Sequence, residues 1–183
     1  GSSGTSFAAP HVSGPIALMK ERNPQMTVPQ IKNILKTTGV PIYDNATNIT
    51  FKRINALNAV EAVPYITKTG QLQSNGVITI NISDPMNPGA MYLTLLSLGN
   101  SPGIPLPNGL TIPLNSDFLF SFSLQPSTIM VNNVGILDNN GRATTTIYIP
   151  YFPGIESFNI YSGFISVTPN LSEFLSVSNS RTL

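Results

Sequence analysis

The chain has 183 residues, of which 41% are hydrophobic and only 9% are charged, and its formal net charge is +1. This composition predicts folded domains with one or two modest cores and excludes the basic stripe that a nucleic-acid or anionic-membrane partner requires. Cysteine is absent, which excludes disulfides and thiolate metal sites, and no apolar run reaches the roughly 18 residues of a membrane span.

The first chemical signature is the run GTSFAAPHVSG, residues 4–14. It places Ser6 at the start of a predicted helix whose small residues would allow deep packing. A serine hydroxyl becomes a strong nucleophile when a histidine takes its proton, and a helix N-terminus offers N–H groups to negative charge developing on a substrate. Ser6 is therefore the candidate catalytic residue.

The single histidine, His11, lies five positions after Ser6. That spacing puts it about 1.4 turns further along the same helix and pointing away from Ser6, so it cannot be the base that activates the serine. We expect His11 to be a packed, hydrogen-bonded structural residue.

Three helices are expected in the first third of the chain. The first ends near Asn23, because the residue before a proline avoids helical backbone, and Pro15 should bend it. In the second, Thr27 and Gln30 form a capping box, and Gly39 suits the position after the helix end. The third covers 52–60, KRINALNAV.

These three segments carry a family resemblance. The first resembles the GTSxAAPHVxG nucleophile motif of the subtilisin-like serine peptidases, or subtilases. The second is similar to the family's LTxxQIKxxL helix, and the third to its GRVNAxxAV helix, although Lys52 replaces the usual glycine. The resemblance identifies residues 1–63 as a C-terminal helical piece of an α/β subtilisin-like catalytic domain.

The resemblance also implies a mechanism. In this family the triad Asp and His precede the serine along the chain. Ser6 would attack a scissile peptide carbonyl, an upstream His would take its proton, and the Ser6 N–H with an upstream Asn would hold the oxyanion. We therefore expect a polypeptide substrate, a secreted or extracellular protein and no activity in this chain by itself.

At Pro64 the hydrophobic pattern changes from helical to alternating. The expected strands are 70–84, 91–98, 118–124, 136–137, 143–149, 155–166 and 174–182. Segment 91–98 should be central because it is densely apolar, and the aromatic side chains of 118–124 should share one face. So many short strands with Pro, Gly and Asn turns predict an antiparallel β-sandwich.

The run DNNG, 138–141, predicts a type I′ hairpin between the strands on either side of it. A calcium loop starting at Asp138 is disfavoured, because Ile149 stands where a bidentate glutamate is required. We expect no metal and no cofactor. Five aromatic residues could form a ligand platform, although core positions are the more usual role of such side chains: Tyr148, Tyr151, Phe152, Tyr161 and Phe164.

The fold class is therefore composite: residues 1–63 are a fragment of a subtilisin-like catalytic domain, and 64–183 are an accessory all-β antiparallel sandwich. The second part resembles uncharacterised β modules at the ends of secreted bacterial proteins. Two alternatives stay open. One is non-catalytic binding by the β domain to a cell surface, a polysaccharide or the peptidase, and the other is an inactive relative. Upstream D-T/S-G and H-G-T-H motifs would distinguish the peptidase from both.

Overall fold

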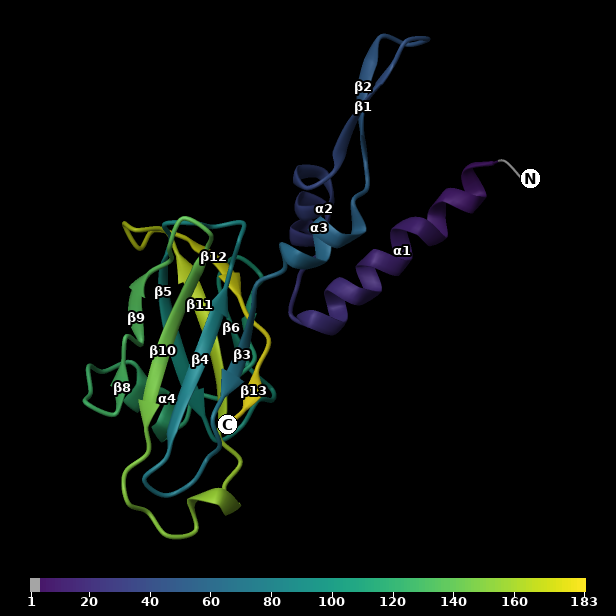
Figure 1. Cartoon of the computed structure of the whole chain (residues 1–183). Coiled ribbons are helices and arrows are strands. Elements are labelled where there is room, and N and C mark those ends of the chain that lie inside the picture. The colour runs from purple at the N-terminus through teal and green to yellow at the C-terminus, as the bar shows by residue number, and fades with distance from the viewer. Residues whose placement is uncertain (1–3) are drawn as a thin grey trace. The chain divides into compact units, whose positions relative to one another are not determined.

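The computed structural model describes residues 4–183, and the chain divides into two compact units, Gly1–Val63 and Pro64–Leu183 (Figure 1). The first unit contains three helices and one hairpin: α1 Thr5–Arg22, α2 Val28–Thr37, β1 Val40–Asp44, β2 Ile49–Arg53 and α3 Ala56–Glu61. The second unit consists mainly of antiparallel strands.

Helix α1 runs through Pro10 and Pro15 without interruption. A proline lacks the N–H that would bond to the preceding turn, yet neither residue ends the helix. The bend expected at Pro15 therefore produces no break. The helix stops at Asn23, as its sequence predicts, and the Asn23 N–H donates to the Met19 carbonyl at 3.0 Å.

Helix α2 has the expected capping box. The Gln30 N–H donates to Thr27 Oγ1 at 3.4 Å, and the Thr27 N–H donates to Gln30 Oε1 at 2.9 Å. Gly39 follows the helix end but does not adopt a left-handed conformation. A Cβ at this position would lie 3.0 Å from the Leu35 carbonyl oxygen and 3.1 Å from that of Arg53, so a larger residue would fit here only if these neighbours shifted by a few tenths of an ångström.

The hairpin formed by β1 and β2 was not expected from the sequence. The strands pair from Val40 with Arg53 to Asp44 with Ile49. Because Arg53 belongs to β2, the helix expected over 52–60 is shorter at its start. It begins at Ala56. Asn55 is its N-cap, because the Asn55 side chain accepts a hydrogen bond from the Asn58 N–H at 3.1 Å.

Two antiparallel sheets make up most of the second unit. The first has the order β3-β4-β10-β8: Tyr65–Thr69, Val77–Ser83, Arg142–Tyr148 and Met130–Val131. The second has the order β12-β11-β5-β9, with β13 also paired to β11: Phe174–Val177, Tyr161–Val167, Met91–Ser97, Val134–Ile136 and Arg181–Thr182. The central position expected for 91–98 is confirmed, since β5 lies between β11 and β9.

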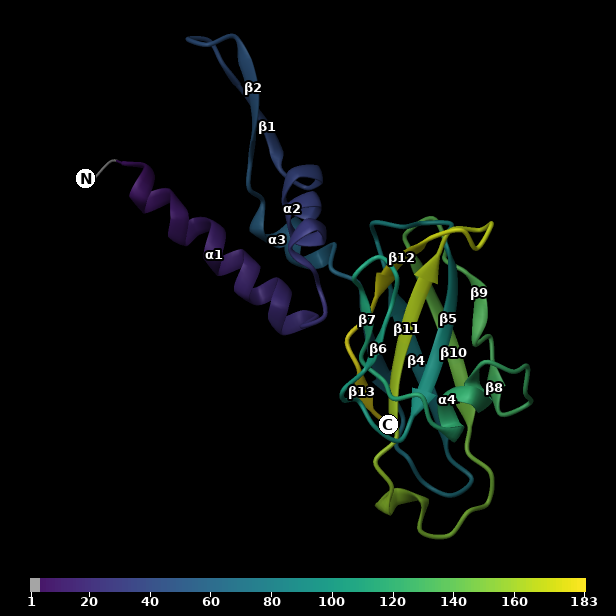
Figure 2. The ribbon, with the colours of Figure 1, turned by 180° about the vertical axis from the view of Figure 1, so that it is seen from behind.

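Shorter elements complete this unit. They are the two-stranded hairpin β6 Ile104–Pro105 with β7 Thr111–Ile112, the helix α4 Phe118–Ser123 and the 3-10 turn Ile155–Ser157. The hairpin lies beside β11 in the view from behind (Figure 2). The strand expected over 155–166 therefore starts only at Tyr161.

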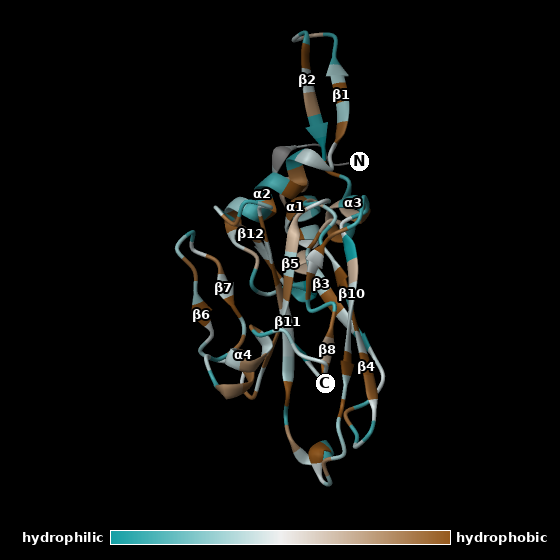
Figure 3. Cartoon of the chain, turned by 90° about the vertical axis from the view of Figure 1, so that its left-hand side faces the viewer, coloured by the Kyte–Doolittle hydropathy of each residue, from teal (hydrophilic) through white to brown (hydrophobic). Residues whose placement is uncertain are grey.

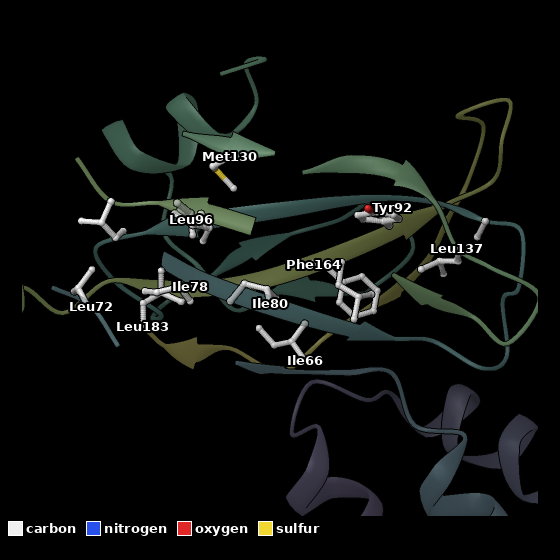
Figure 4. Close-up of a cluster of buried hydrophobic side chains, with 14 residues drawn as sticks. Ile66, Leu72, Ile78, Ile80, Tyr92, Leu96, Met130, Leu137, Phe164 and Leu183 are labelled. Carbon is white, nitrogen blue, oxygen red and sulfur yellow. The ribbon is translucent and has the colours of Figure 1, made fainter. Parts of the chain in front are cut away.

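The side chains between the two sheets form one hydrophobic cluster. Ile78 and Ile80 of β4 pack in it with Leu96 of β5 and Phe164 of β11 (Figure 4). The apolar face predicted for β4 is confirmed, because Ile78, Ile80 and Ile82 are buried while the residues between them are not fully buried. Figure 3 shows apolar segments, coloured brown, spread along the strands of both sheets.

The strand expected over 118–124 is wrong, because this segment is helix α4. Asp117 caps it: Asp117 Oδ1 accepts from the Phe120 N–H at 2.9 Å. A capped turn of helix satisfies the backbone locally, and tertiary packing then decides against the alternating pattern. Phe118 is 79% exposed, so the aromatic side chains do not share a buried face.

The hairpin predicted at 138–141 is also wrong. The preceding strand β9 pairs with β5, whereas the following strand β10 pairs with β4 and β8, so the turn connects two sheets. Its conformation differs from type I′ as well, because Gly141 has a φ of 69° while Asn139 and Asn140 do not have positive φ. A Cβ on Gly141 would collide with the Asp84 carbonyl, so this position requires glycine.

Candidate functional site

Ser6 lies in the first turn of α1, with its side chain exposed. Gly4 occupies the N-cap position and makes no side-chain cap. The first four N–H groups of a helix have no intrahelical partner, so the Ser6 N–H is directed toward whatever lies before the helix. The helix dipole also favours negative charge at this end. This location is compatible with the predicted role of Ser6, which needs an exposed hydroxyl and an unpaired N–H on one residue.

His11 is not placed to activate Ser6. Its Nδ1 lies 2.8 Å from the Phe7 carbonyl oxygen, and because a carbonyl can only accept, Nδ1–H is the donor. The hydrogen-bonded role expected for His11 is confirmed, but the packed role is wrong, because the side chain is exposed. Packing in this half of α1 would need a neighbouring layer that unit 1 does not contain.

The surface of α1 is covered on one side only. Its buried positions include Pro15 and Met19, one turn apart, and α1 packs on α3. Phe7 is 58% exposed and Leu18 is 51% exposed. A helix with apolar residues around most of its circumference is typical of a buried element, so unit 1 leaves apolar surface of α1 uncovered.

Acyl transfer at Ser6 would need a base within hydrogen-bond reach. His11 is the only histidine in the sequence, and its Nδ1 is already bonded to the helix backbone. The first turn of α1 contains no acidic residue either. Neither His11 nor an acidic residue of the first turn of α1 is placed to act as that base.

Among residues 4–183 there is no group of three or more His, Asp or Glu side chains that could hold a metal ion. None of the described helices combines the length and apolar character needed to cross a membrane.

A buried polar cluster in the second unit was missed in the sequence. Asp84 follows β4, and its Oδ2 accepts from Ser166 Oγ at 2.7 Å and from Ser176 Oγ at 2.6 Å. Asn87 Nδ2 donates to both carboxyl oxygens, at 3.0 and 3.1 Å. Burial raises the pKa of Asp84, and the hydrogen bonds from Ser176, Ser166 and Asn87 oppose that rise.

This cluster is structural, because Ser166 and Ser176 belong to the opposite sheet and the carboxyl group links the two sheets. In the sequence, Asp84 is only the last residue of the strand expected over 70–84. Only the pairing of β11 with β12 reveals its partners.

The aromatic residues considered for a ligand platform are divided between different environments. Phe164 is completely buried in the core, while Tyr148 is 49% and Tyr151 is 74% exposed. Phe152 makes an edge-on contact with Phe158, with ring centroids 5.9 Å apart. The five aromatic residues considered from the sequence therefore do not form one ligand platform.

Two depressions lie on the outer faces of the sheets. One, of about 490 Å³, lies over β3, β4 and β10, and its lining is mixed, with the apolar residues Ile82 and Ala143 beside polar ones. We call its polar strand residues the polar sheet face: Tyr65, Thr67, Asn81, Ser83, Arg142 and Thr144. The other, of about 280 Å³, is apolar and lies over the second sheet, with Leu93, Val134 and Phe174 in its lining.

Comparisons with known proteins find similarity in the first unit. Residues 1–60 match the model of the subtilase family. Three similar proteins come from Arabidopsis thaliana. The chain is 33% identical to Subtilisin-like protease SBT2.5 over 94 residues and 33% identical to Subtilisin-like protease SBT5.1 over 92 residues. It is 34% identical to Subtilisin-like protease SBT1.6 over 90 residues. No solved structure matches the chain.

These matches involve about half of this chain and only 10% of each relative. The subtilase resemblance of the N-terminal motifs is confirmed. The resemblance of 64–183 to bacterial β modules is not supported by any of them.

Proposed function

We propose that this chain, whose first 60 residues are a subtilase-family segment, is the C-terminal part of a secreted subtilisin-like serine endopeptidase. Residues 1–63 belong to the catalytic domain, and 64–183 are an accessory β-sandwich. The observation that carries the proposal is Ser6, in the family motif, at the N-terminus of an 18-residue helix. Relatives named as subtilisin-like proteases support it.

In the proposed reaction, Ser6 Oγ attacks the carbonyl carbon of a peptide bond while its proton passes to a histidine upstream of this chain. The charge that develops on the carbonyl oxygen is stabilised by the Ser6 N–H, aided by the dipole of α1. The acyl-enzyme is then hydrolysed by water. The residues of this chain supply the nucleophile and one oxyanion donor.

The chain of 183 residues should be inactive, because its single histidine, His11, is not placed to accept the Ser6 proton. Treated with a fluorophosphonate probe, it should remain unlabelled at Ser6 in intact-mass measurements. Labelling at ordinary probe concentrations would show that a base is present and that the proposed division of the triad is wrong.

The complete protein tests the nucleophile directly. Ser6→Ala should lower kcat by a factor on the order of 10⁴ to 10⁶ while leaving the fold intact. Ser13→Ala is the matched control, since Ser13 is exposed on the same helix and bonds only locally, to the Pro10 carbonyl at 3.3 Å. It should retain activity within about twofold. Near-normal turnover by Ser6→Ala would exclude the peptidase assignment for this serine.

A non-catalytic binding role for 64–183 is the second candidate, and the polar sheet face favours it. This role is compatible with the first, because the two functions would reside in different units.

A further inference from the structure

The outward side chains of β3, β4 and β10 form rows across three strands. Directly paired residues of an antiparallel sheet have their side chains on the same face. Pairing places Thr67 beside Asn81 and Asn81 beside Thr144. The neighbouring rows are Tyr65, Ser83 and Arg142 on one side, and Thr69, Thr79 and Thr146 on the other. The core-facing side chains alternate with these, so the rows lie on the outside of the sheet.

The rows extend along the strands to a second tyrosine. Tyr148 pairs with Val77. Because side chains alternate along a strand, Tyr148 lies on the same face as Arg142. Tyr65 belongs to the same row as Arg142. Tyr148 lies six positions after Arg142 along β10, which corresponds to roughly 20 Å. Tyr65 is half-buried and Tyr148 is 49% exposed. The outer face therefore has an aromatic side chain at each end and hydroxyl and amide groups between them.

The depression of about 490 Å³ lies over the first two rows, with Asp138 of the connecting turn in its lining. Its volume is in the range of about 300–1,000 Å³ that small-molecule sites occupy. Within residues 4–183, the side chains of Thr67, Asn81 and Thr144 make no hydrogen bond to another side chain or to the backbone. Their donors and acceptors are thus directed to solvent or to a ligand.

The chemistry of this face selects among ligands. Arg142 and Asp138 carry opposite charges, and the other polar side chains of the lining are neutral, so the depression has no net charge to attract an ion. Threonine hydroxyls and the asparagine amide each donate and accept, as the hydroxyls of a sugar do, and a tyrosine ring can cover the apolar face of a sugar ring. An apolar ligand would leave these polar groups unpaired.

We propose that the polar sheet face binds a neutral oligosaccharide chain, extended along β4 and β10 between Tyr65 and Tyr148. Hydrogen bonds from Thr67, Asn81 and Thr144 would hold its hydroxyl groups. This inference concerns the second unit and does not depend on the role of Ser6.

The test uses the full 183-residue chain, labelled with ¹⁵N and titrated with cellohexaose, xylohexaose, mannohexaose and, as an acidic probe, a galacturonic acid hexamer. We expect saturable shifts with at least one neutral hexasaccharide, concentrated in the amides of 65–69, 77–83 and 142–148. The acidic hexamer should bind more weakly than the best neutral one.

Substitutions locate the contacts. Asn81→Ala and Tyr65→Ala should each weaken binding roughly threefold to tenfold, the effect of losing one hydrogen bond or one stacking contact. The matched controls are Asn100→Ala and Tyr151→Ala, which change exposed residues outside the face and should bind as the parent does. If the amide signals of the Asn81→Ala variant are no longer dispersed, that variant has not folded. The Thr144→Val variant then takes its place in the test, because Thr144 is exposed and its substitution should not affect folding.

The proposal is overturned if no neutral hexasaccharide shifts these amides at millimolar concentration, which would make this an ordinary solvated face. Shifts confined to the apolar depression, unchanged binding by the face variants, or stronger binding of the acidic hexamer would also overturn it.

Discussion

The two units of this chain enclose their apolar side chains to different extents. In the second unit Ile66, Ile78 and Phe164 are completely buried between its own two sheets. In the first unit Phe7 and Phe51 are each more than half exposed. Hydrophobic content alone therefore does not make a self-sufficient domain. The second unit closes its core internally, whereas the first has large apolar side chains on its surface.

Buried polar groups occur in both units: Asn23 of the first unit is completely buried, and its Oδ1 accepts from the Gln25 N–H at 3.0 Å. The second unit pairs Thr94 with Thr145 at 2.6 Å and links its sheets through Asp84. In the first unit the hairpin side chains Tyr43 and Asn48 bond to each other at 2.9 Å on the exposed surface. Paired polar groups inside a core favour one arrangement of the sheets, while exposed pairs contribute little to stability.

Separating the units should give the largest contrast. A fragment starting at Pro64 should unfold cooperatively as a β protein, because its core lies within it. Residues 1–63 alone should be largely disordered or aggregated, because apolar surface of α1 and of the β1–β2 hairpin stays uncovered. Circular dichroism and sedimentation of both fragments measure this. A monomeric, protease-resistant 1–63 fragment would contradict the proposal that it is part of a larger domain.

Two phenylalanine substitutions in the full chain sharpen the comparison. Phe164→Ala should lower the free energy of unfolding of the second unit by about 3–5 kcal/mol, the usual effect of emptying a buried aromatic site. Phe51→Ala, at a site that is 52% exposed, should change stability by less than about 0.5 kcal/mol. Urea unfolding, measured in each unit separately through hydrogen exchange of its own amides, distinguishes the stability change caused by Phe164→Ala from that caused by Phe51→Ala. Equal losses would show that Phe51 is packed in solution.

Substituting Asp84 should change the free energy of unfolding by less than Phe164→Ala does, and the change should depend on pH. Burial raises its pKa in the folded protein, so the folded state binds the proton more tightly than the unfolded state. Its contribution to stability is therefore full below the ordinary Asp pKa of about 3.9 and is lost as pH rises through the higher folded value. Asp84→Asn should remove this dependence, so the stability of the parent relative to Asp84→Asn should fall with rising pH across that window.

Subtracting the stability of Asp84→Asn from that of the parent at each pH isolates the contribution of Asp84. Carboxyl groups whose pKa is lowered by folding have the opposite pH dependence and cancel in this difference. The pKa of Asp117 is lowered, since hydrogen bonds from Ser97, Phe120 and Leu98 outweigh its burial. Asp84→Ala is the second comparison: it leaves Ser166 and Ser176 without their acceptor and should cost roughly 2–4 kcal/mol. A difference curve that is flat or rises with pH would show that burial does not control this carboxyl group.

The sequence by itself determined the features that depend on neighbouring residues. The capping box of α2, the end of α1 before Pro24 and the apolar face of β4 were all predicted, because local hydrogen bonds and side-chain alternation specify them. The motif around Ser6 also indicated a resemblance to the subtilase family, whose model matches residues 1–60.

Tertiary structure decided what depends on residues far apart in the chain. Asp117 turned an alternating aromatic segment into α4, and the two strands beside DNNG separated into different sheets because each found a better partner elsewhere. The partners of Asp84 come from strands about 80 and 90 residues away. Sequence patterns record the preferences of each segment, but long-range pairing depends on how all segments together fill the core and satisfy their polar groups, which no single segment contains.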